Sequence, residues 1–138
     1  MVEIYVEYLG DLHCKVKHGP SGQEFLTDAP LDNEGKAEYI SPTDLLATAS
    51  ASCITTIMGI VARNNNIDIV GLKVKATKEM VNVPFRRISK LTIDFVFPKE
   101  LNDKEFQLMS NVVKTCPVTR SLSPEVDLEV HFKVPGRD

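Results

Sequence analysis

The first part of the chain alternates between apolar and polar residues. Over residues 2–9 every second residue is apolar, which is the period of a half-buried strand. The alternation continues over residues 12–17, and a turn rich in Gly and Pro at residues 18–22 precedes a third short apolar stretch at 23–27. We therefore expect three strands joined by short turns.

A polar segment over residues 28–40 follows, long enough for a loop with a functional role. Ser41 then provides an N-cap, Pro42 suits the first helical position, and Asp44 resembles the acid of a capping box. The apolar spacing predicts a helix from Pro42 to about Asn64. The stripe that we expect this helix to bury consists of Leu46, Ala49, Cys53, Ile57 and Ile60.

The second half of the chain repeats both kinds of pattern. Strands are predicted over residues 69–81 and 86–97, and a last strand over 126–134. Between them, Asn102 or Asp103 can cap a second helix. The apolar stripe of that helix is Phe106, Met109, Val113 and Cys116. The order of strands, long helix, two strands, helix and strand predicts an α+β fold.

Length and charge narrow the function classes. The 138 residues suit one domain, 1–138, and the net charge of -3 argues against a nucleic-acid binder. The lysines are scattered, as on a solvated strand face. No uninterrupted apolar run approaches the roughly 18 residues of a membrane span. Acidic residues stand where a signal peptide needs a basic start, so we expect a cytoplasmic protein that does not contact a membrane.

The chain has three cysteines: Cys14, Cys53 and Cys116. An odd count without a signal peptide speaks against a disulfide framework, and no Cys or His spacing supports a zinc site, so we expect no metal. Cys14 lies on the apolar side of a predicted strand, where free cysteine packs as a small hydrophobic residue.

The other two thiols are candidates for chemistry. Cys53 lies in mid-helix, where burial raises a thiol pKa, and taken alone it is more typical of an inert core residue. Cys116 precedes Pro117, which breaks a helix. A peroxide can oxidise one thiolate to a sulfenic acid, which a second thiol converts to a disulfide. That reaction needs the two Cα atoms within about 7 Å.

Two segments resemble the OsmC/organic hydroperoxide resistance (Ohr) family. Residues 41–53 are similar to its Pro-x-acid helix start that leads through small residues to a first cysteine, and residues 116–122 to its Cys-Pro motif. The resemblance implies an OsmC-like fold of antiparallel sheets around a long central helix, in an intertwined homodimer with active sites at the interface. It also implies that Cys53 is the peroxidatic and Cys116 the resolving thiol, that organic hydroperoxides are the substrates and an external dithiol the reductant, and that no cofactor is needed.

The chain also departs from the family's peroxidases, which hold the thiolate with an arginine and a glutamate. No arginine precedes Arg63, and the glutamate position falls on Thr43, with Asp44 better suited to capping. Arg86, Arg87 or Arg120 could supply the cation. The chain is thus more similar to the OsmC-like branch. The main hypothesis is a thiol-dependent hydroperoxide reductase; the alternatives are a non-catalytic protein that binds a small apolar ligand at the dimer interface, and thiols that serve packing alone.

Overall fold

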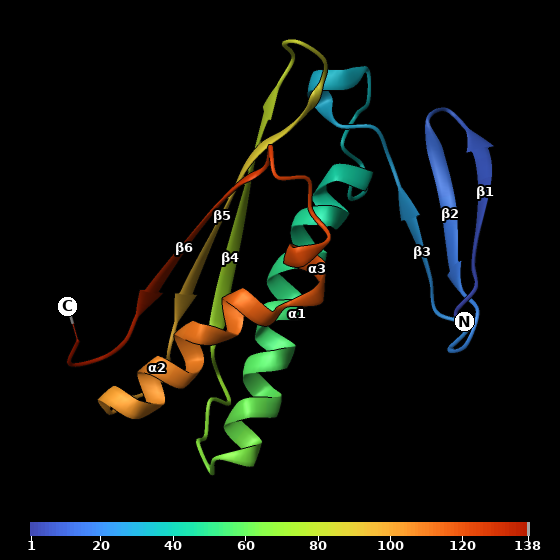
Figure 1. The fold of residues 1–138 in the computed structure, drawn as a ribbon. Helices are drawn as coiled ribbons and strands as arrows, with labels where there is room; N and C mark the ends of the chain where they lie inside the picture. The colour runs from blue at the N-terminus through green and yellow to red at the C-terminus, as the bar shows by residue number, and fades with distance from the viewer. Residues whose placement is uncertain (138) are drawn as a thin grey trace. The chain divides into compact units, whose positions relative to one another are not determined.

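The computed structural model describes residues 1–137 (Figure 1). The chain divides into two compact units, one of residues Met1–Leu46 and the other from Ala47 onward. The elements confirm an α+β fold with two sheets and a long helix. Each unit is described by itself below.

The first unit contains the three predicted strands. β1 (Ile4–Gly10), β2 (His13–His18) and β3 (Glu24–Thr27) form an antiparallel sheet in that order. Cys14 lies in β2, half-buried, opposite Tyr8 of β1. The apolar side chains of β1 are largely exposed: Ile4 61%, Val6 63% and Tyr8 65%. The chain alone therefore leaves this strand uncovered.

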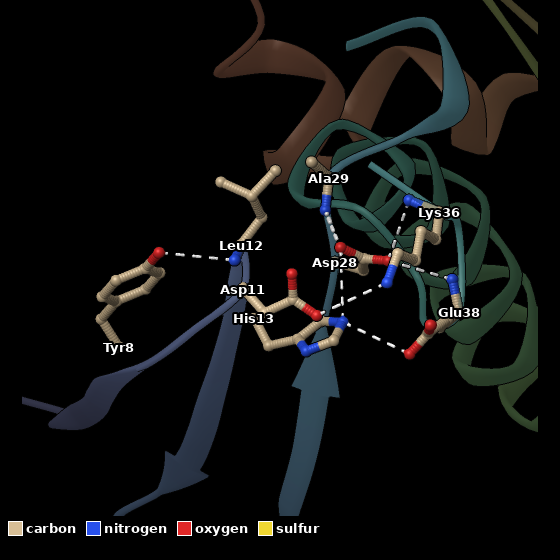
Figure 2. Close-up of polar contacts among 8 residues, drawn as sticks. All are labelled: Tyr8, Asp11, Leu12, His13, Asp28, Ala29, Lys36 and Glu38. Atoms are coloured by element: carbon tan, nitrogen blue, oxygen red, sulfur yellow. Dashed lines mark hydrogen bonds and ion pairs between the residues drawn. The ribbon is translucent and has the colours of Figure 1, made fainter. Parts of the chain in front are cut away.

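A buried carboxylate organises the loop after β3, which also contains the short 3-10 helix η1 (Leu31–Asn33). Asp28 is 2% exposed and accepts hydrogen bonds from the backbone N–H groups of Ala29, Lys36 and Glu38, at 2.7, 3.3 and 3.1 Å (Figure 2). The Nε2 atom of His13 lies 3.5 Å from Oδ1 of Asp28 and 3.5 Å from Oε2 of Glu38. These contacts close the loop around one side chain.

The pKa of Asp28 follows from these contacts. Burial acts to raise it, but the N–H donors and the adjacent His13 outweigh burial, so that the pKa lies below its ordinary value. The folded loop therefore favours the charged carboxylate.

Helix α1 (Pro42–Asn64) has the predicted bounds. Its capping box is also present, since the Ser41 N–H donates to Oδ2 of Asp44 at 3.0 Å and the Asp44 N–H to Oγ of Ser41 at 3.1 Å. Asp44 thus has the expected capping role. By length and composition alone α1 could cross a membrane, a property that it shares with core helices of soluble proteins.

The predicted buried stripe of α1 was wrong by one residue along most of the helix and by two residues at its end. Leu46 and Ile60 are 39% and 45% exposed, and Cys53 is half-buried. The buried side chains are instead Ala47, Ser50, Ile54, Met58 and Ala62. One residue turns the helix by about 100°. Both faces carry apolar residues, so the period alone did not select the face that packs within the chain.

The second sheet is mixed rather than antiparallel throughout. β4 (Lys73–Val81) pairs with β5 (Arg87–Val96) in antiparallel orientation, whereas β6 (Asp127–Lys133) runs parallel to β5. β4 begins four residues later than predicted because Gly71, with φ +96°, turns the chain just before it.

Parallel neighbours require a long crossover, and the segment between β5 and β6 provides it. It contains α2 (Asp103–Asn111), the 3-10 helix η2 (Val112–Thr115) and α3 (Pro117–Arg120). Asn102 caps α2 in a complete capping box with Glu105. The helical turn of α3 was not predicted. Pro117 ends η2, as expected, but it also starts a new turn, because proline fits the first position of a helix.

The core lies between the helices and one face of this sheet, which α1 and α2 cross in Figure 1. A register shift between Glu79 and Met80 of β4 explains why Ile88 and Leu91, three residues apart, are both buried. The Phe95 and Phe132 rings stack at 5.5 Å between centroids. The hydrophobic core around Phe95 also contains Ile54, Met58, Ile93, Met109, Val112 and Cys116.

Candidate active site

The structure brings two of the three cysteines together. Cys53 lies in the middle of α1 and is half-buried, whereas Cys116 lies between η2 and α3 and is 0% exposed. Their side chains lie close enough for each thiol to shift the pKa of the other, and neither forms a disulfide. The sequence motifs predicted both residues. The packing of α1 against the crossover segment brings them close together.

The backbone around Cys116 is shaped by the following proline. Cys116 has φ -66° and ψ 120°, the extended conformation that a residue before proline prefers, and it is the N-cap of α3. Its side chain makes no capping hydrogen bond, but the nearby N–H groups of Val118 and Thr119 act to lower the pKa of its thiol. Oγ1 of Thr119 donates to the carbonyl oxygens of Cys116, at 3.0 Å, and of Val113, at 3.3 Å.

The two sulfurs differ in their electrostatic environment. The pKa of Cys53 is raised, first by burial and then by the hydrogen bond to Cys116, although a Val118 N–H acts against this. Burial also acts to raise the pKa of Cys116, but the hydrogen bonds from Cys53 and Thr119, with that of the Val118 N–H, outweigh it and lower the pKa. The two thiols therefore influence one another's pKa and titrate as a pair.

The donors around the sulfurs are uncharged. The arginines that the sequence offered as replacements lie in other contacts: Nε of Arg87 is 3.5 Å from Oε2 of Glu125, and Arg86 donates to Asn82 at 3.4 Å. Arg120 ends α3 and is exposed. Residues 1–137 contain no group of three or more His, Cys, Asp or Glu side chains placed to hold a metal ion.

Sequence reasoning missed Thr119 and the two amide groups. The signal was present, because Cys116, Pro117 and Thr119 occupy the N-cap, N1 and N3 positions of a helical turn. The N2 and N3 residues of this turn are Val118 and Thr119, whose N–H groups act to lower the pKa of Cys116.

The fold and the paired thiols define an α+β protein with a candidate dithiol redox site. The family model described as OsmC-like protein matches residues 35–131. This protein belongs to the OsmC/Ohr family, as the two motifs predicted.

Solved structures agree with this assignment. A candidate osmotic stress induced and detoxification response protein from Psychrobacter arcticus is 45% identical, with a TM-score of 0.90 and 96% of each chain covered. An organic hydroperoxide resistance protein OsmC from Legionella pneumophila is 15% identical (TM-score 0.77, 97% of each chain). The organic hydroperoxide resistance protein OhrB of Bacillus subtilis is also 15% identical (TM-score 0.73, 96% of this chain and 98% of that one). The comparison with curated protein sequences gave no significant match.

Proposed function

We propose that this protein is a thiol-dependent reductase of organic hydroperoxides that uses Cys53 and Cys116 as its redox pair. The observation that carries the proposal is the proximity of the two free thiols, which belong to the same packed cluster, since a sulfenic acid on one sulfur would form near its resolving thiol. Relatives that are named organic hydroperoxide resistance proteins, with the same fold, support the substrate class.

The exposure of the two cysteines supports different roles for them in this proposal. Cys53 is half-buried and Cys116 is fully buried, so the sulfur that an oxidant can approach is that of Cys53. Cys53 attacks the hydroperoxide, the O–O bond breaks, and an alcohol and a Cys53 sulfenic acid result. Cys116 then forms the disulfide and releases water, and an external dithiol restores the two thiols. This cycle needs no organic cofactor, and its reduced resting state suits the cytoplasm.

The proposal includes a homodimer. Apolar side chains of β1 are more than half exposed, and the outward positions Leu46 and Ile60 of α1 are also open. Exposed apolar side chains of this kind, in either unit, often mark a protein interface. The family model spans residues on both sides of Leu46, which supports treating residues 1–138 as one OsmC-like domain.

The test measures consumption of cumene hydroperoxide with a dithiol reductant. Cys53→Ser is expected to abolish turnover, and Cys116→Ser to prevent the disulfide that mass mapping should find in oxidised wild-type protein. Cys14→Ser is the matched control, because Cys14 lies in the first sheet, and it should retain the wild-type rate. Equal rates for wild type and Cys53→Ser would overturn the proposal.

A second candidate function is a non-catalytic protein that binds a small apolar ligand at the dimer interface. The observation in its favour is that uncharged groups, and not an arginine, contact the sulfurs. Native mass spectrometry of the purified protein would detect a bound ligand. Repeated absence of a ligand together with robust turnover would rule it out.

A further inference from the structure

The proposed reaction requires the sulfur of Cys116 to reach the sulfur of Cys53 after the hydroperoxide has oxidised Cys53. A disulfide forms only within narrow limits of distance and dihedral angle. The rate at which this disulfide closes therefore depends on how firmly the backbone around Cys116 is held.

Cys116 lies at a break between two helical segments. η2 ends at Thr115 and α3 begins at Pro117, and Cys116 lies between them in an extended conformation with ψ 120°. An α-helix that continued through this point would bond the N–H group of residue 117 to the carbonyl oxygen of Val113. Residue 117 is a proline, which has no N–H group. The proline therefore removes a backbone hydrogen bond next to the cysteine.

The hydroxyl group of Thr119 takes the place of the missing donor. Its Oγ1 donates to the carbonyl oxygen of Val113 at 3.3 Å, and it also donates to the carbonyl oxygen of Cys116 at 3.0 Å. Val113 belongs to η2 and Thr119 to α3, so this one side chain connects the two segments. The N–H group of Arg120 donates to the same Cys116 carbonyl oxygen at 3.0 Å. Two donors from α3 thus hold the carbonyl group of the cysteine.

Two neighbouring hydroxyl groups do not cross the break. Thr115 donates to the carbonyl oxygen of Val112 at 3.0 Å, within η2. Ser121, which directly follows α3, donates to the carbonyl oxygen of Pro117 at 2.8 Å. Of these three hydroxyl groups, only that of Thr119 joins the segments on either side of the break. Its removal would deprive a partly buried backbone of a donor at that point.

Building on the proposed function, we propose that Thr119 is a positioning residue for the resolving step. Its two hydrogen bonds hold the backbone of Cys116 in the conformation from which the Cys116 sulfur attacks the sulfur of the Cys53 sulfenic acid. In that step the S–S bond forms, the S–O bond breaks, and the departing hydroxide leaves as water with the proton of the Cys116 thiol. Thr119 takes no part in the earlier attack of Cys53 on the hydroperoxide.

The first experiment separates the two steps in a Cys14→Ser background, in which only the two thiols of the site remain. In a single turnover with cumene hydroperoxide, the oxidation of Cys53 depends on the hydroperoxide concentration, whereas closure of the disulfide does not. Quenching with an alkylating reagent and mass mapping follow both steps in time. Thr119→Val should leave the first rate unchanged and slow the second by on the order of tenfold, as expected for the loss of about one net hydrogen bond.

Two variants serve as controls. Thr119→Ser keeps the hydroxyl group and should restore most of the closure rate. Thr115→Val makes the same isosteric change at a hydroxyl group that bonds within η2, and it should close the disulfide at the parent rate. Closure of Thr119→Val at the parent rate or faster would overturn the proposal and would mean that packing alone holds the buried Cys116. Equal slowing of Thr119→Ser or Thr115→Val would overturn it as well.

The second experiment measures the same attack without hydroperoxide. A mixed disulfide of Cys53 with thionitrobenzoate releases coloured thionitrobenzoate when the Cys116 sulfur displaces it. Thr119→Val should slow this release by a factor similar to that of the first experiment, and Thr119→Ser and Thr115→Val should not. An unchanged rate of release in Thr119→Val would contradict the positioning role.

The two proposals fail differently. If no variant reacts with hydroperoxide, the proposed function is lost, while the release of thionitrobenzoate still reports how Cys116 is held. If the parent protein turns over and Thr119→Val closes its disulfide at the parent rate, the function stands and the positioning role is wrong. Thermal unfolding of the variants shows whether they are folded, because a general loss of structure would change both steps and not the second alone.

Discussion

β1 and β5 look alike in sequence and differ in their surroundings. Both alternate between apolar and polar residues, but Leu91, Ile93 and Phe95 of β5 are at most 1% exposed, whereas Ile4 and Val6 of β1 are more than 60% exposed. The difference teaches that alternating apolar and polar residues predict a strand with one apolar and one polar side. The alternation does not show whether the same chain covers the apolar side.

The two units differ accordingly in what holds them together. The second has a continuous apolar core between α1, α2 and the mixed sheet. In the first, a buried carboxylate and its N–H donors organise the loop, and much of the apolar surface stays open. We therefore expect the second unit to depend on its own packing and the first to depend on a partner.

The largest effect is expected from a cavity in the second unit. Phe95→Ala should lower the free energy of unfolding by about 3–5 kcal/mol, because the Phe95 ring is fully buried and stacks on Phe132. Val70→Ala, at a position 87% exposed, is the control and should have little effect. Urea denaturation followed by circular dichroism measures both. Similar losses in the two variants would mean that the buried core is not what stabilises the second unit.

A smaller effect on folding, but a clear one on assembly, is expected in the first unit. Val6→Asp places a charge on the open side of β1, and sedimentation should show a shift from dimer to monomer. Lys17→Gln in β2 changes the net charge equally at an exposed polar position and should leave the dimer intact. A Val6→Asp protein that sediments as the wild type does would mean that β1 is not at the interface.

The smallest expected effect is the loss of stability in acid that depends on Asp28. Because the folded state lowers the pKa of Asp28 below its ordinary value of 3.8, the stabilisation is present above that value and is lost as pH falls through the folded-state pKa. Asp28→Asn should be less stable than wild type near neutral pH and should show a weaker decline in acid. Thermal unfolding between about pH 6 and about pH 3 tests this. Parallel pH profiles for the two proteins would mean that another group controls the decline.

Local signals predicted much of the fold. The caps at Ser41 and Asn102 and the bounds of α1 depend on neighbouring residues, and the structure confirms them. The buried face of α1 and the parallel orientation of β6 depend on what packs against them. Those are properties of the tertiary structure, which a hydrophobic period does not encode.

The candidate site was also predicted only in part. Motifs identified Cys53 and Cys116, and the structure brings them together, but the effect of Val118 and Thr119 on the pKa of Cys116 follows from a four-residue helical turn that was not predicted. Arg86 and Arg87 illustrate the converse. Residue type made them candidates for a charge partner, but the contacts described for them are to Asn82 and Glu125.

The uncharged surroundings of Cys116 have a consequence for the conditions under which the protein could work. Mobile ions weaken attractions between full charges across water, but they have little access to a fully buried sulfur. The reactivity of the proposed redox pair should therefore stay nearly constant as ionic strength changes. A cell whose internal salt concentration rises sharply would keep the proposed chemistry without adjusting the protein.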